Sequence, residues 1–188
     1  NIFKFDLSKI SLFEKYINKN SFEFNSYDAF ISLTGYMKTK KFSQIKSADL
    51  LDHINSNYIA NFLIIQRLLA KMKKKKWGRV LLASSIGTKF GGGNLTIPYS
   101  LSKYLNEFFP STYKEYYKYN ILINTLQIGV TDTKLHLKDK SKNMKRRIQL
   151  IPIKKMASVK EVVKYIYFLS SEENTLITNQ VINISGGE

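Results

Sequence analysis

The chain has 188 residues, of which 44% are hydrophobic and 13% aromatic, and its formal net charge at pH 7 is +16. This composition excludes an intrinsically disordered chain and fits one globular domain with a buried core. The absence of cysteine excludes disulfides and a cysteine nucleophile, and two histidines far apart in the sequence, His53 and His136, argue against a metal site. The sequence has no apolar run of about 18 residues and no secretory-signal pattern, so we expect a cytoplasmic protein with no membrane partner.

The positive charge comes almost entirely from lysine, with 26 lysines against four arginines. The lysines are scattered in short groups, for example at residues 38–41, 71–79 and 138–147. Because arginine reads phosphates and base edges better than lysine does, this distribution argues against a nucleic-acid partner. The lysines at residues 73–76 end an amphipathic helix pattern, where positive charge complements the helix dipole, and attraction of an anionic partner or cofactor is the alternative.

Hydrophobic periods predict strands and helices in alternation along the chain. The strands are expected at residues 1–6, 27–34, 80–83, 120–127 and 176–184. The capping-box pattern Ser-x-x-Glu predicts helix starts at Ser11 and Ser158, and Ser47 can cap a long helix. A further helix is expected over residues 99–118, with a kink at Pro110 because proline lacks the amide hydrogen.

Strands that alternate with helices throughout indicate an α/β fold, a doubly wound Rossmann-like parallel sheet, in a single domain over residues 1–188. In such sheets the ligand lies at the carboxyl ends of the strands. The residues directly after each strand are therefore candidates for the functional site. They are Gly35, Ser84, Ser85, Gly129, Thr131 and Thr133.

The helix that follows Ser85 carries Tyr99 and Lys103, which share one helix face at a spacing of four residues. An ammonium beside a phenol favours the phenolate and lowers the tyrosine pKa from about 10. Such a tyrosine can exchange a proton with a reacting oxygen near neutral pH while a serine hydroxyl holds that oxygen.

The Tyr-x-x-x-Lys spacing alone is weak evidence, since about two chance matches are expected in a chain with this many tyrosines and lysines. The sequence contains two, Tyr36 with Lys40 and Tyr99 with Lys103. Only Tyr99 follows a strand, a serine pair and a glycine-rich loop, so we expect Tyr36 to be a loop residue.

Three passages carry a family resemblance in collinear order: GRVLLASSIG leading to YSLSK, then NILINTLQIGVTDT, then ENTLITNQVINISGGE. With them the chain resembles the short-chain dehydrogenase/reductase family over essentially all of its length, and the group of 3-oxoacyl-acyl-carrier-protein reductases in particular. The resemblance implies an NAD- or NADP-dependent oxidoreductase that transfers a hydride between nicotinamide and a carbonyl or secondary alcohol. It also implies a homo-oligomer.

The resemblance leaves the substrate open between a carrier-linked thioester and a small molecule such as a sugar. An acidic carrier would be attracted by residues 138–147, whose other interpretation is a solvated helix face.

The resemblance implies a role for each matching residue of the catalytic group. Tyr99 would be the general acid/base, and Lys103 would lower its pKa and hold the nicotinamide ribose. Ser85 would bind the substrate oxygen, with Ser84 as the alternative if the loop is shifted by one residue.

Asn57 matches the helix asparagine that holds a relay water in the family. Asn55 is the competing position, and a solvated helix residue is the other interpretation of Asn57. Asp6 matches the acid that contacts the adenine ring, with a helix cap as the alternative. Further cofactor contacts are implied for Gly35, Val130 and Thr133.

The chain departs from the family pattern where the dinucleotide phosphates would bind. The family's glycine-rich turn is absent, and the first 77 residues contain one glycine, Gly35. Residues 1–6 match the family's third strand, so we expect an N-terminally truncated sequence that lacks the first two βα units and is inactive alone. A non-catalytic or degenerate Rossmann-like module is the alternative.

Two smaller departures lie in the loops after strands. The sequence Ser-Leu-Thr-Gly at residues 32–35 replaces the family's Asn-Asn-Ala-Gly, so amide side chains that brace the sheet are lost. Ile128 stands where proline is usual before Gly129.

Overall fold

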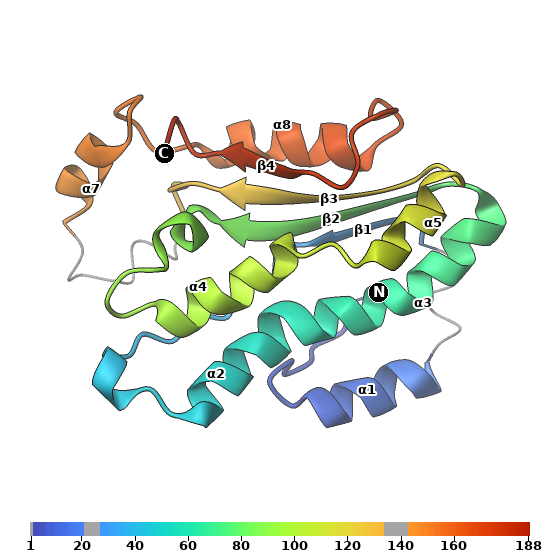
Figure 1. The fold of residues 1–188 in the computed structure, drawn as a ribbon, viewed down its shortest axis with the longest axis horizontal. Coiled ribbons are helices and arrows are strands. Elements are labelled where there is room, and N and C mark those ends of the chain that lie inside the picture. The colour runs from blue at the N-terminus through green and yellow to red at the C-terminus, as the bar shows by residue number, and fades with distance from the viewer. Residues whose placement is uncertain (1, 21–26, 134–142) are drawn as a thin grey trace.

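The computed structural model describes residues 2–20, 27–133 and 143–188, and its centre is a parallel sheet (Figure 1). Four strands lie in the order β1-β2-β3-β4, and each pairs in parallel with its neighbour. They are β1 (Ala29–Ser32), β2 (Gly78–Ser85), β3 (Ile121–Ile128) and β4 (Val181–Ile184). The chain therefore returns over the sheet between successive strands, as a parallel arrangement requires.

Helices cover both faces of the sheet (Figure 1). One face carries α1 (Ile10–Lys19), α2 (Ser47–Ile54), α3 (Ala60–Lys75), α4 (Ile97–Tyr104) and α5 (Lys114–Tyr117), and the other carries α8 (Val159–Ser170). Helix α7 (Met144–Leu150) lies beyond the carboxyl ends of the strands. The doubly wound α/β class expected from the sequence is confirmed.

The apolar core is divided between the two faces because successive side chains of a strand point in opposite directions. Val80 and Leu82 of β2 pack with the α3 face in a cluster that includes Leu68 and Met72. Leu81, between them, packs instead with Leu126 of β3 and Leu169 of α8. β2 and β3 are thus buried on both sides, which explains why their sequences do not alternate between apolar and polar residues.

The strand expected at residues 1–6 is wrong for the part that the structure describes. Residues 2–6 belong to no strand, and within the described residues β1 pairs with β2 alone. A strand needs a neighbour to satisfy its backbone groups, and these residues have none. Phe5 instead packs its ring edge against Phe13 of α1, 5.2 Å away between centroids.

Two of the three predicted helix caps are wrong. α1 begins at Ile10 with Lys9 at the N-cap, so Ser11 lies inside the helix. α2 begins at Ser47 itself, and its entry is held by the Asp49 carboxylate, which accepts from the Lys46 amide at 2.9 Å.

The third cap is confirmed in α8. Ser158 and Glu161 form the reciprocal pair of hydrogen bonds that defines a capping box. The pattern Ser-x-x-Glu fixes two positions, so it also occurs by chance at places where it does not cap a helix.

The helix expected over residues 99–118 is interrupted rather than kinked. α4 ends at Tyr104, and a short turn at Leu105–Glu107 leads to an extended stretch before Pro110. Because proline restricts the residue before it to extended conformations, the helix cannot continue through Phe109. α5 resumes only at Lys114. None of the helices in the described ranges is long and apolar enough to cross a lipid bilayer.

Candidate active site

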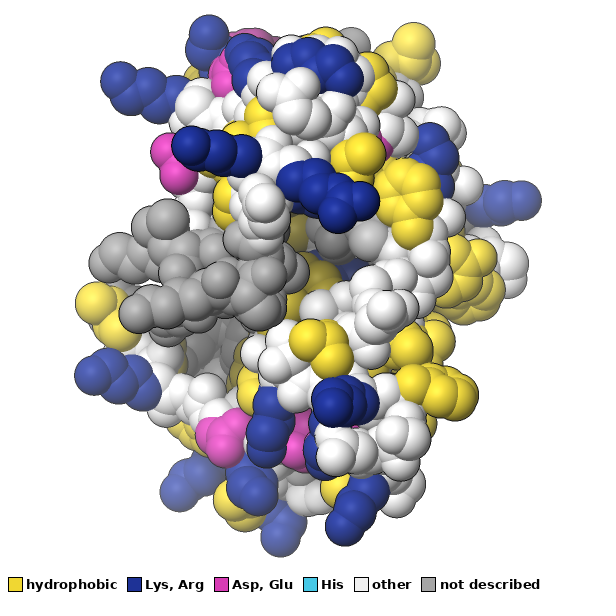
Figure 2. Space-filling model, turned by 90° about the vertical axis from the view of Figure 1, so that its left-hand side faces the viewer, with side chains coloured by type: hydrophobic (Ala, Val, Ile, Leu, Met, Phe, Trp, Pro, Cys, Tyr) yellow, Lys and Arg dark blue, Asp and Glu magenta, His cyan; other side chains and the backbone are white. Residues whose placement is uncertain are grey.

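A cavity of about 1110 Å³ opens at the carboxyl edge of the sheet. Its wall comes from the segments after β1, β2 and β3, and from α4, α7 and α8. Figure 2 shows this end of the molecule, with a central hollow and basic side chains dispersed around it. The parallel topology brings these loops to one place, as the sequence analysis expected.

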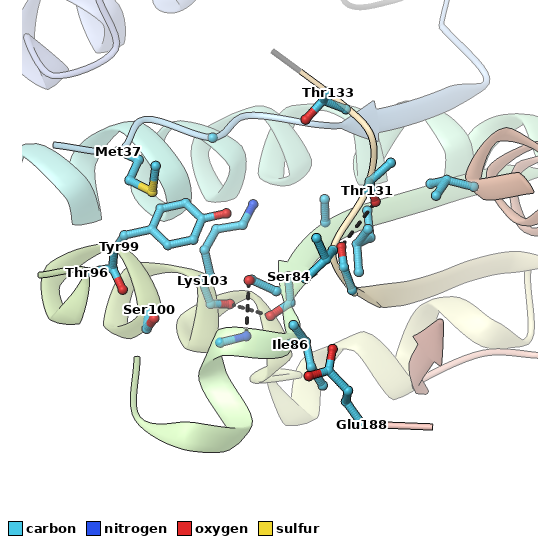
Figure 3. A pocket seen from close by; sticks show the side chains of 18 of the residues that line it. Met37, Ser84, Ile86, Thr96, Tyr99, Ser100, Lys103, Thr131, Thr133 and Glu188 are labelled. Carbon is cyan, nitrogen blue, oxygen red and sulfur yellow. Dashed lines mark hydrogen bonds between the residues drawn. The ribbon is translucent and has the colours of Figure 1, made fainter. Parts of the chain in front are cut away.

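Tyr99 and Ser85 both line this cavity, and Figure 3 shows the Tyr99 ring directed into it. β2 ends at Ser85, and α4 begins at Ile97 with a proline in its first turn, which places Tyr99 at the start of the helix. The Ser85 side chain is close enough to the Tyr99 hydroxyl to act on it, since it lowers the pKa of this phenol against the effect of burial. Ser84 points the other way and donates to the Lys103 carbonyl at 3.2 Å. Ser85, and not Ser84, therefore faces the tyrosine.

Lys103 lies one turn after Tyr99 and is 2% exposed. Its Nζ donates to the Thr34 carbonyl at 2.8 Å, so α4 is tied to the loop after β1. Burial lowers the pKa of Lys103 to about 8. Figure 3 shows its ammonium and the Tyr99 hydroxyl directed to the same part of the cavity.

The pKa of Tyr99 does not move in the direction expected from the sequence. Burial raises it above the usual value, and the hydrogen bond from Ser85 opposes this rise. The expected lowering assumed an ammonium acting on a solvated phenol. Here the phenol is half-buried, and the Lys103 ammonium is itself destabilised by burial, so desolvation is the larger effect.

Asn57 is completely buried in a π-helical turn, Asn55–Ile59, between α2 and α3. Its Oδ1 accepts from the Tyr36 amide at 2.8 Å, and its Nδ2 donates to the Tyr36 carbonyl at 2.9 Å. Asn57 therefore fixes the loop that follows Gly35, and it is not a solvated helix residue. Asn55 points away and donates to the Ser8 carbonyl at 3.3 Å.

The main-chain carbonyl of Asn57 is also fully engaged. It accepts from the side-chain amides of Asn61 at 2.8 Å and Asn106 at 3.0 Å. Two donors satisfy both lone pairs of a carbonyl oxygen. Sequence reasoning identified neither amide, although an asparagine on the apolar side of α3 is a usable signal.

The cofactor residues implied by the resemblance separate into two groups. Gly35, Val130 and Thr133 line the cavity. Asp6 is exposed outside the cavity wall, and its carboxylate accepts from the Ser8 amide at 3.0 Å and hydroxyl at 2.8 Å. These hydrogen bonds lower the pKa of Asp6, which closes a turn ahead of α1.

The changed Ser-Leu-Thr-Gly segment keeps a brace for the sheet by another route. Ser32 Oγ donates to Asn61 Oδ1 at 2.7 Å and lies 3.1 Å from the Thr34 hydroxyl. The Asn61 amide of α3 thus contacts the hydroxyls of both Ser32 and Thr34.

The other Tyr-x-x-x-Lys pair is structural, because Tyr36 lies in the loop and Lys40 forms an ion pair with Asp49 at 2.6 Å.

A second set of residues that sequence reasoning missed lies under Ser85. The Glu107 carboxylate accepts from Ser84 Oγ at 2.5 Å, Thr88 Oγ1 at 2.7 Å and Gln127 Nε2 at 3.2 Å. Ser84 and Thr88 flank Ser85, so Glu107 fixes the loop that carries it. No spacing rule joins these positions, because they come from three separate elements.

A parallel sheet covered on both faces, with a cavity at its carboxyl edge, defines a Rossmann-like α/β protein. A family profile described as enoyl-(acyl carrier protein) reductase matches residues 1–188. The chain therefore belongs to this family of short-chain dehydrogenases/reductases.

Curated relatives include 3-oxoacyl-[acyl-carrier-protein] reductases. FabG of Aquifex aeolicus (strain VF5) is 30% identical over 161 residues, which cover 85% of this chain and 64% of the relative. FabG of Buchnera aphidicola subsp. Schizaphis graminum (strain Sg) is 27% identical, with coverage of 95% and 82%. The chain thus spans slightly less than two thirds of the Aquifex protein.

Solved structures with similar folds share less sequence. A 3-oxoacyl (acyl-carrier-protein) reductase from Agrobacterium tumefaciens C58 with NADP bound has a TM-score of 0.83 and 22% identity, over 97% of this chain and 72% of that chain. ElxO with NADP bound has a TM-score of 0.83 and 24% identity, over 100% and 77%. At these identities the similarity shows the fold alone.

Proposed function

We propose that this chain is the catalytic part of an NAD- or NADP-dependent oxidoreductase that acts on a carbonyl or secondary-alcohol carbon. The observation that carries the proposal is the convergence of the Tyr99, Ser85 and Lys103 side chains on one cavity. A proton donor, an oxygen ligand and a buried cation are the groups that carbonyl reduction requires.

The residues present fit the nicotinamide half of the cofactor. The cavity is walled by Val130 and Thr133, and the backbone at Gly35 is open, since a Cβ added there would have its nearest neighbour at 3.9 Å. Lys103 would hold the ribose hydroxyls. The glycine-rich turn that would hold the pyrophosphate is not among the 188 residues. When bound, the cofactor supplies or accepts the hydride.

The protein side chains handle the proton. Ser85 Oγ binds the substrate oxygen, and the Tyr99 hydroxyl transfers its proton to that oxygen as negative charge develops. Because burial raises the pKa of Tyr99, the phenol is protonated at neutral pH and ready to act as an acid. The Lys103 cation stabilises the phenolate that the transfer leaves. Asn57 positions the loop after Gly35.

The substrate and partners are proposals of the same kind. The names of the curated relatives favour a carrier-linked 3-oxoacyl group over a small molecule such as a sugar. Attraction of an acidic carrier by residues 138–147 is part of this proposal, although residues 138–142 lie outside the described ranges. A homo-oligomer in the cytoplasm is the expected context.

A non-catalytic module is the second candidate, and the missing glycine-rich turn favours it. Turnover separates the two. The protein is expressed from its whole reading frame, and NADPH or NADH oxidation is followed with 3-oxoacyl thioesters and simple ketones. Activity supports the oxidoreductase, whereas a folded protein that turns over no carbonyl supports the module.

The Tyr99→Phe variant tests the assigned chemistry. It removes one hydroxyl, and kcat is expected to fall by about 100-fold to 10,000-fold, the usual contribution of a positioned acid. Tyr104→Phe is the matched control, because Tyr104 lies on the same helix and is 59% exposed. If Tyr99→Phe retained the kcat of the unmodified protein, the assignment of the proton donor would be wrong.

A further inference from the structure

Two opposite charges, Arg147 and Glu188, form part of the cavity wall where most neighbours are apolar. Arg147 belongs to the last turn of α7, and Glu188 follows the glycine pair after β4. The same wall contains Ile86, Leu150 and Pro152. Burying charge among apolar groups is unfavourable unless the charges are fully paired, so this pair requires an explanation.

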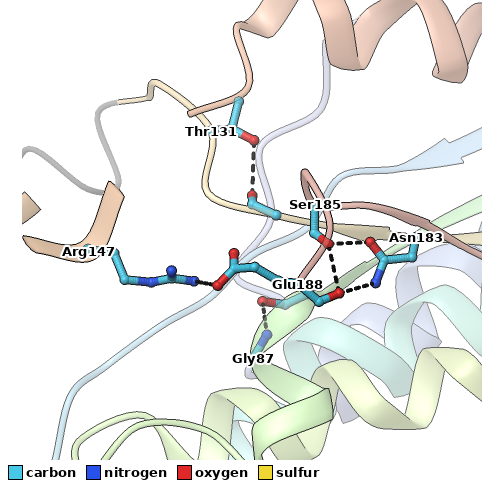
Figure 4. A network of polar contacts seen from close by, with 8 residues as sticks. Gly87, Thr131, Arg147, Asn183, Ser185 and Glu188 are labelled. Carbon is cyan, nitrogen blue, oxygen red and sulfur yellow. Dashed lines mark hydrogen bonds and ion pairs between the residues drawn. The ribbon is translucent and has the colours of Figure 1, made fainter. Parts of the chain in front are cut away.

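The two groups are only half paired (Figure 4). Arg147 Nη2 lies 2.6 Å from Glu188 Oε1, and the Glu188 side chain is 6% exposed. The second atoms, Arg147 Nη1 and Glu188 Oε2, are buried without a hydrogen-bond partner. A bidentate arginine–carboxylate pair would satisfy both, and here one donor and one acceptor remain unused.

The backbone that carries the Glu188 side chain is held by its own hydrogen bonds. The Glu188 main-chain oxygen accepts from Asn183 Nδ2 at 3.3 Å and from Ser185 Oγ at 3.2 Å, as Figure 4 shows. Asn183 also donates to Gln127 Oε1 at 2.9 Å, which ties this turn to β3. The turn that bears Glu188 is therefore tied to the sheet, whereas Arg147 comes from α7.

We infer that Arg147 and Glu188 form a subsite for a neutral polar group of the substrate, a hydroxyl or a carboxamide. Such a group accepts a hydrogen bond from Nη1 and donates one to Oε2, which satisfies both unused atoms. The ion pair parts enough to admit the group from the cavity that both residues line.

Other ligand classes do not meet both requirements. An anion is repelled by Glu188, a cation is repelled by Arg147, and an alkyl group leaves the donor and the acceptor unsatisfied. In Figure 3 Glu188 lies on the Ile86 side of the cavity, and Tyr99 lies on the other. The polar group thus belongs to a part of the substrate away from the reacting carbonyl. This inference rests on the proposed function, because it assigns a second contact to the same substrate.

The test compares matched ketones. One series carries a terminal hydroxyl, as in 5-hydroxypentan-2-one, and the other carries a methyl in its place, as in hexan-2-one. In both series the chain from the carbonyl carbon to the terminal oxygen or methyl is varied from about four to about eight atoms. For the best chain length we expect kcat/KM to favour the hydroxyl by about 100-fold or more, since a site built to bind a hydroxyl strongly rejects its absence.

The double variant Arg147→Met with Glu188→Met removes both charges at similar volume. Its preference for the hydroxyl is expected to fall below about 10-fold. Lys145→Met is the matched control, because it removes one exposed charge of the same helix outside the cavity wall, and it should keep the preference.

Binding of the same ketones is measured by saturation-transfer NMR, which needs no turnover. If the protein reduces no ketone, the proposed function fails, and the subsite is still decided by the difference in binding. Equal binding and turnover of both series would overturn the inference. So would a double variant whose melting temperature falls while its hydroxyl preference stays, because that result assigns the pair a structural role alone.

Discussion

The ammonium of Lys103 is the most demanding buried group of the active site. It is 2% exposed and has one carbonyl acceptor, Thr34, within hydrogen-bond distance. Desolvation lowers its pKa from 10.5 to about 8, so the folded chain releases this proton more readily than the unfolded chain does. Burial of this charged group destabilises the folded state, so we expect it where a cation is needed for function.

This pKa predicts how stability depends on pH. Below about pH 8 the lysine is charged in both states and the folded state bears the full penalty. Between about 8 and 10.5 the unfolded state binds more protons, so stability rises with pH, and above 10.5 the penalty is gone. The total effect is about 3 kcal/mol, from about 1.4 kcal/mol per pKa unit.

The measurement is urea unfolding at a series of pH values for the unmodified protein and Lys103→Met. The methionine variant should be the more stable one at pH 7, and its advantage should shrink as the pH rises from 8 to 10.5. A stability difference that stays constant from pH 7 to 10.5 would contradict the burial argument.

Secondary-structure elements were predictable where a residue's neighbours in sequence decide its environment. The doubly buried strands β2 and β3 and the capped helix α8 follow from local patterns. The strand expected at residues 1–6 is wrong, because a strand depends on a pairing partner elsewhere in the chain. The cap expected at Ser11 is wrong, because the helix already begins at Ile10.

The candidate site follows the same rule. The sequence places Tyr99, Lys103 and Ser85 at one cavity because the parallel topology brings strand ends together, whereas Asn57 lies outside the cavity wall; their catalytic roles stay predictions. The polar partner Glu107 could not be located in this way, since its donors come from β2, β3 and the loop between them and their distance in space is not encoded in any spacing.

Helix capping provides a test at this scale. Ser158→Ala removes the hydroxyl that accepts from the Glu161 amide at 3.2 Å and should lower the free energy of unfolding by about 1 kcal/mol. Ser47→Ala is the control, because Ser47 lies inside the first turn and an N1 hydroxyl does not cap; its effect should stay below about 0.5 kcal/mol. Equal losses measured by urea unfolding would refute the assigned caps.

The junction of β3 and β4 depends on the glycine after β3. A Cβ added at Gly129 would lie 2.5 Å from Ser185 Cα. The backbone cannot move away without breaking the hydrogen bond that the Gly129 amide donates to the Ile184 carbonyl. Gly129→Ala should therefore lower the free energy of unfolding by about 3 kcal/mol. Gly35→Ala, with its nearest contact at 3.9 Å, should change it by less than about 1 kcal/mol. Thermal unfolding of both variants checks the contrast, and similar melting temperatures would contradict it.

The whole molecule carries 30 basic and 14 acidic side chains, and on the face shown in Figure 2 the basic side chains are dispersed. With 30 basic and 14 acidic side chains, at least 16 basic ones cannot be matched one to one with an acid. The ion pairs among the described residues include Lys40 with Asp49 and Lys155 with Glu161. Exposed pairs contribute about 0.2–1 kcal/mol each. Repulsion among the uncompensated lysines acts throughout the surface and opposes the compact state.

Salt therefore has two opposing effects, and their sizes decide the outcome. Raising NaCl from about 20 mM to about 500 mM shortens the screening length from about 20 Å to about 4 Å, which weakens the few pairs but removes repulsion among many more like charges. We expect a net gain of about 1 kcal/mol, or about 3 °C in the melting temperature. A triple variant with glutamate at three exposed lysines, Lys15, Lys74 and Lys145, lowers the formal charge by six and should show a smaller salt response. Calorimetry of both proteins decides the matter. A melting temperature that falls with salt would mean that the ion pairs outweigh the repulsion.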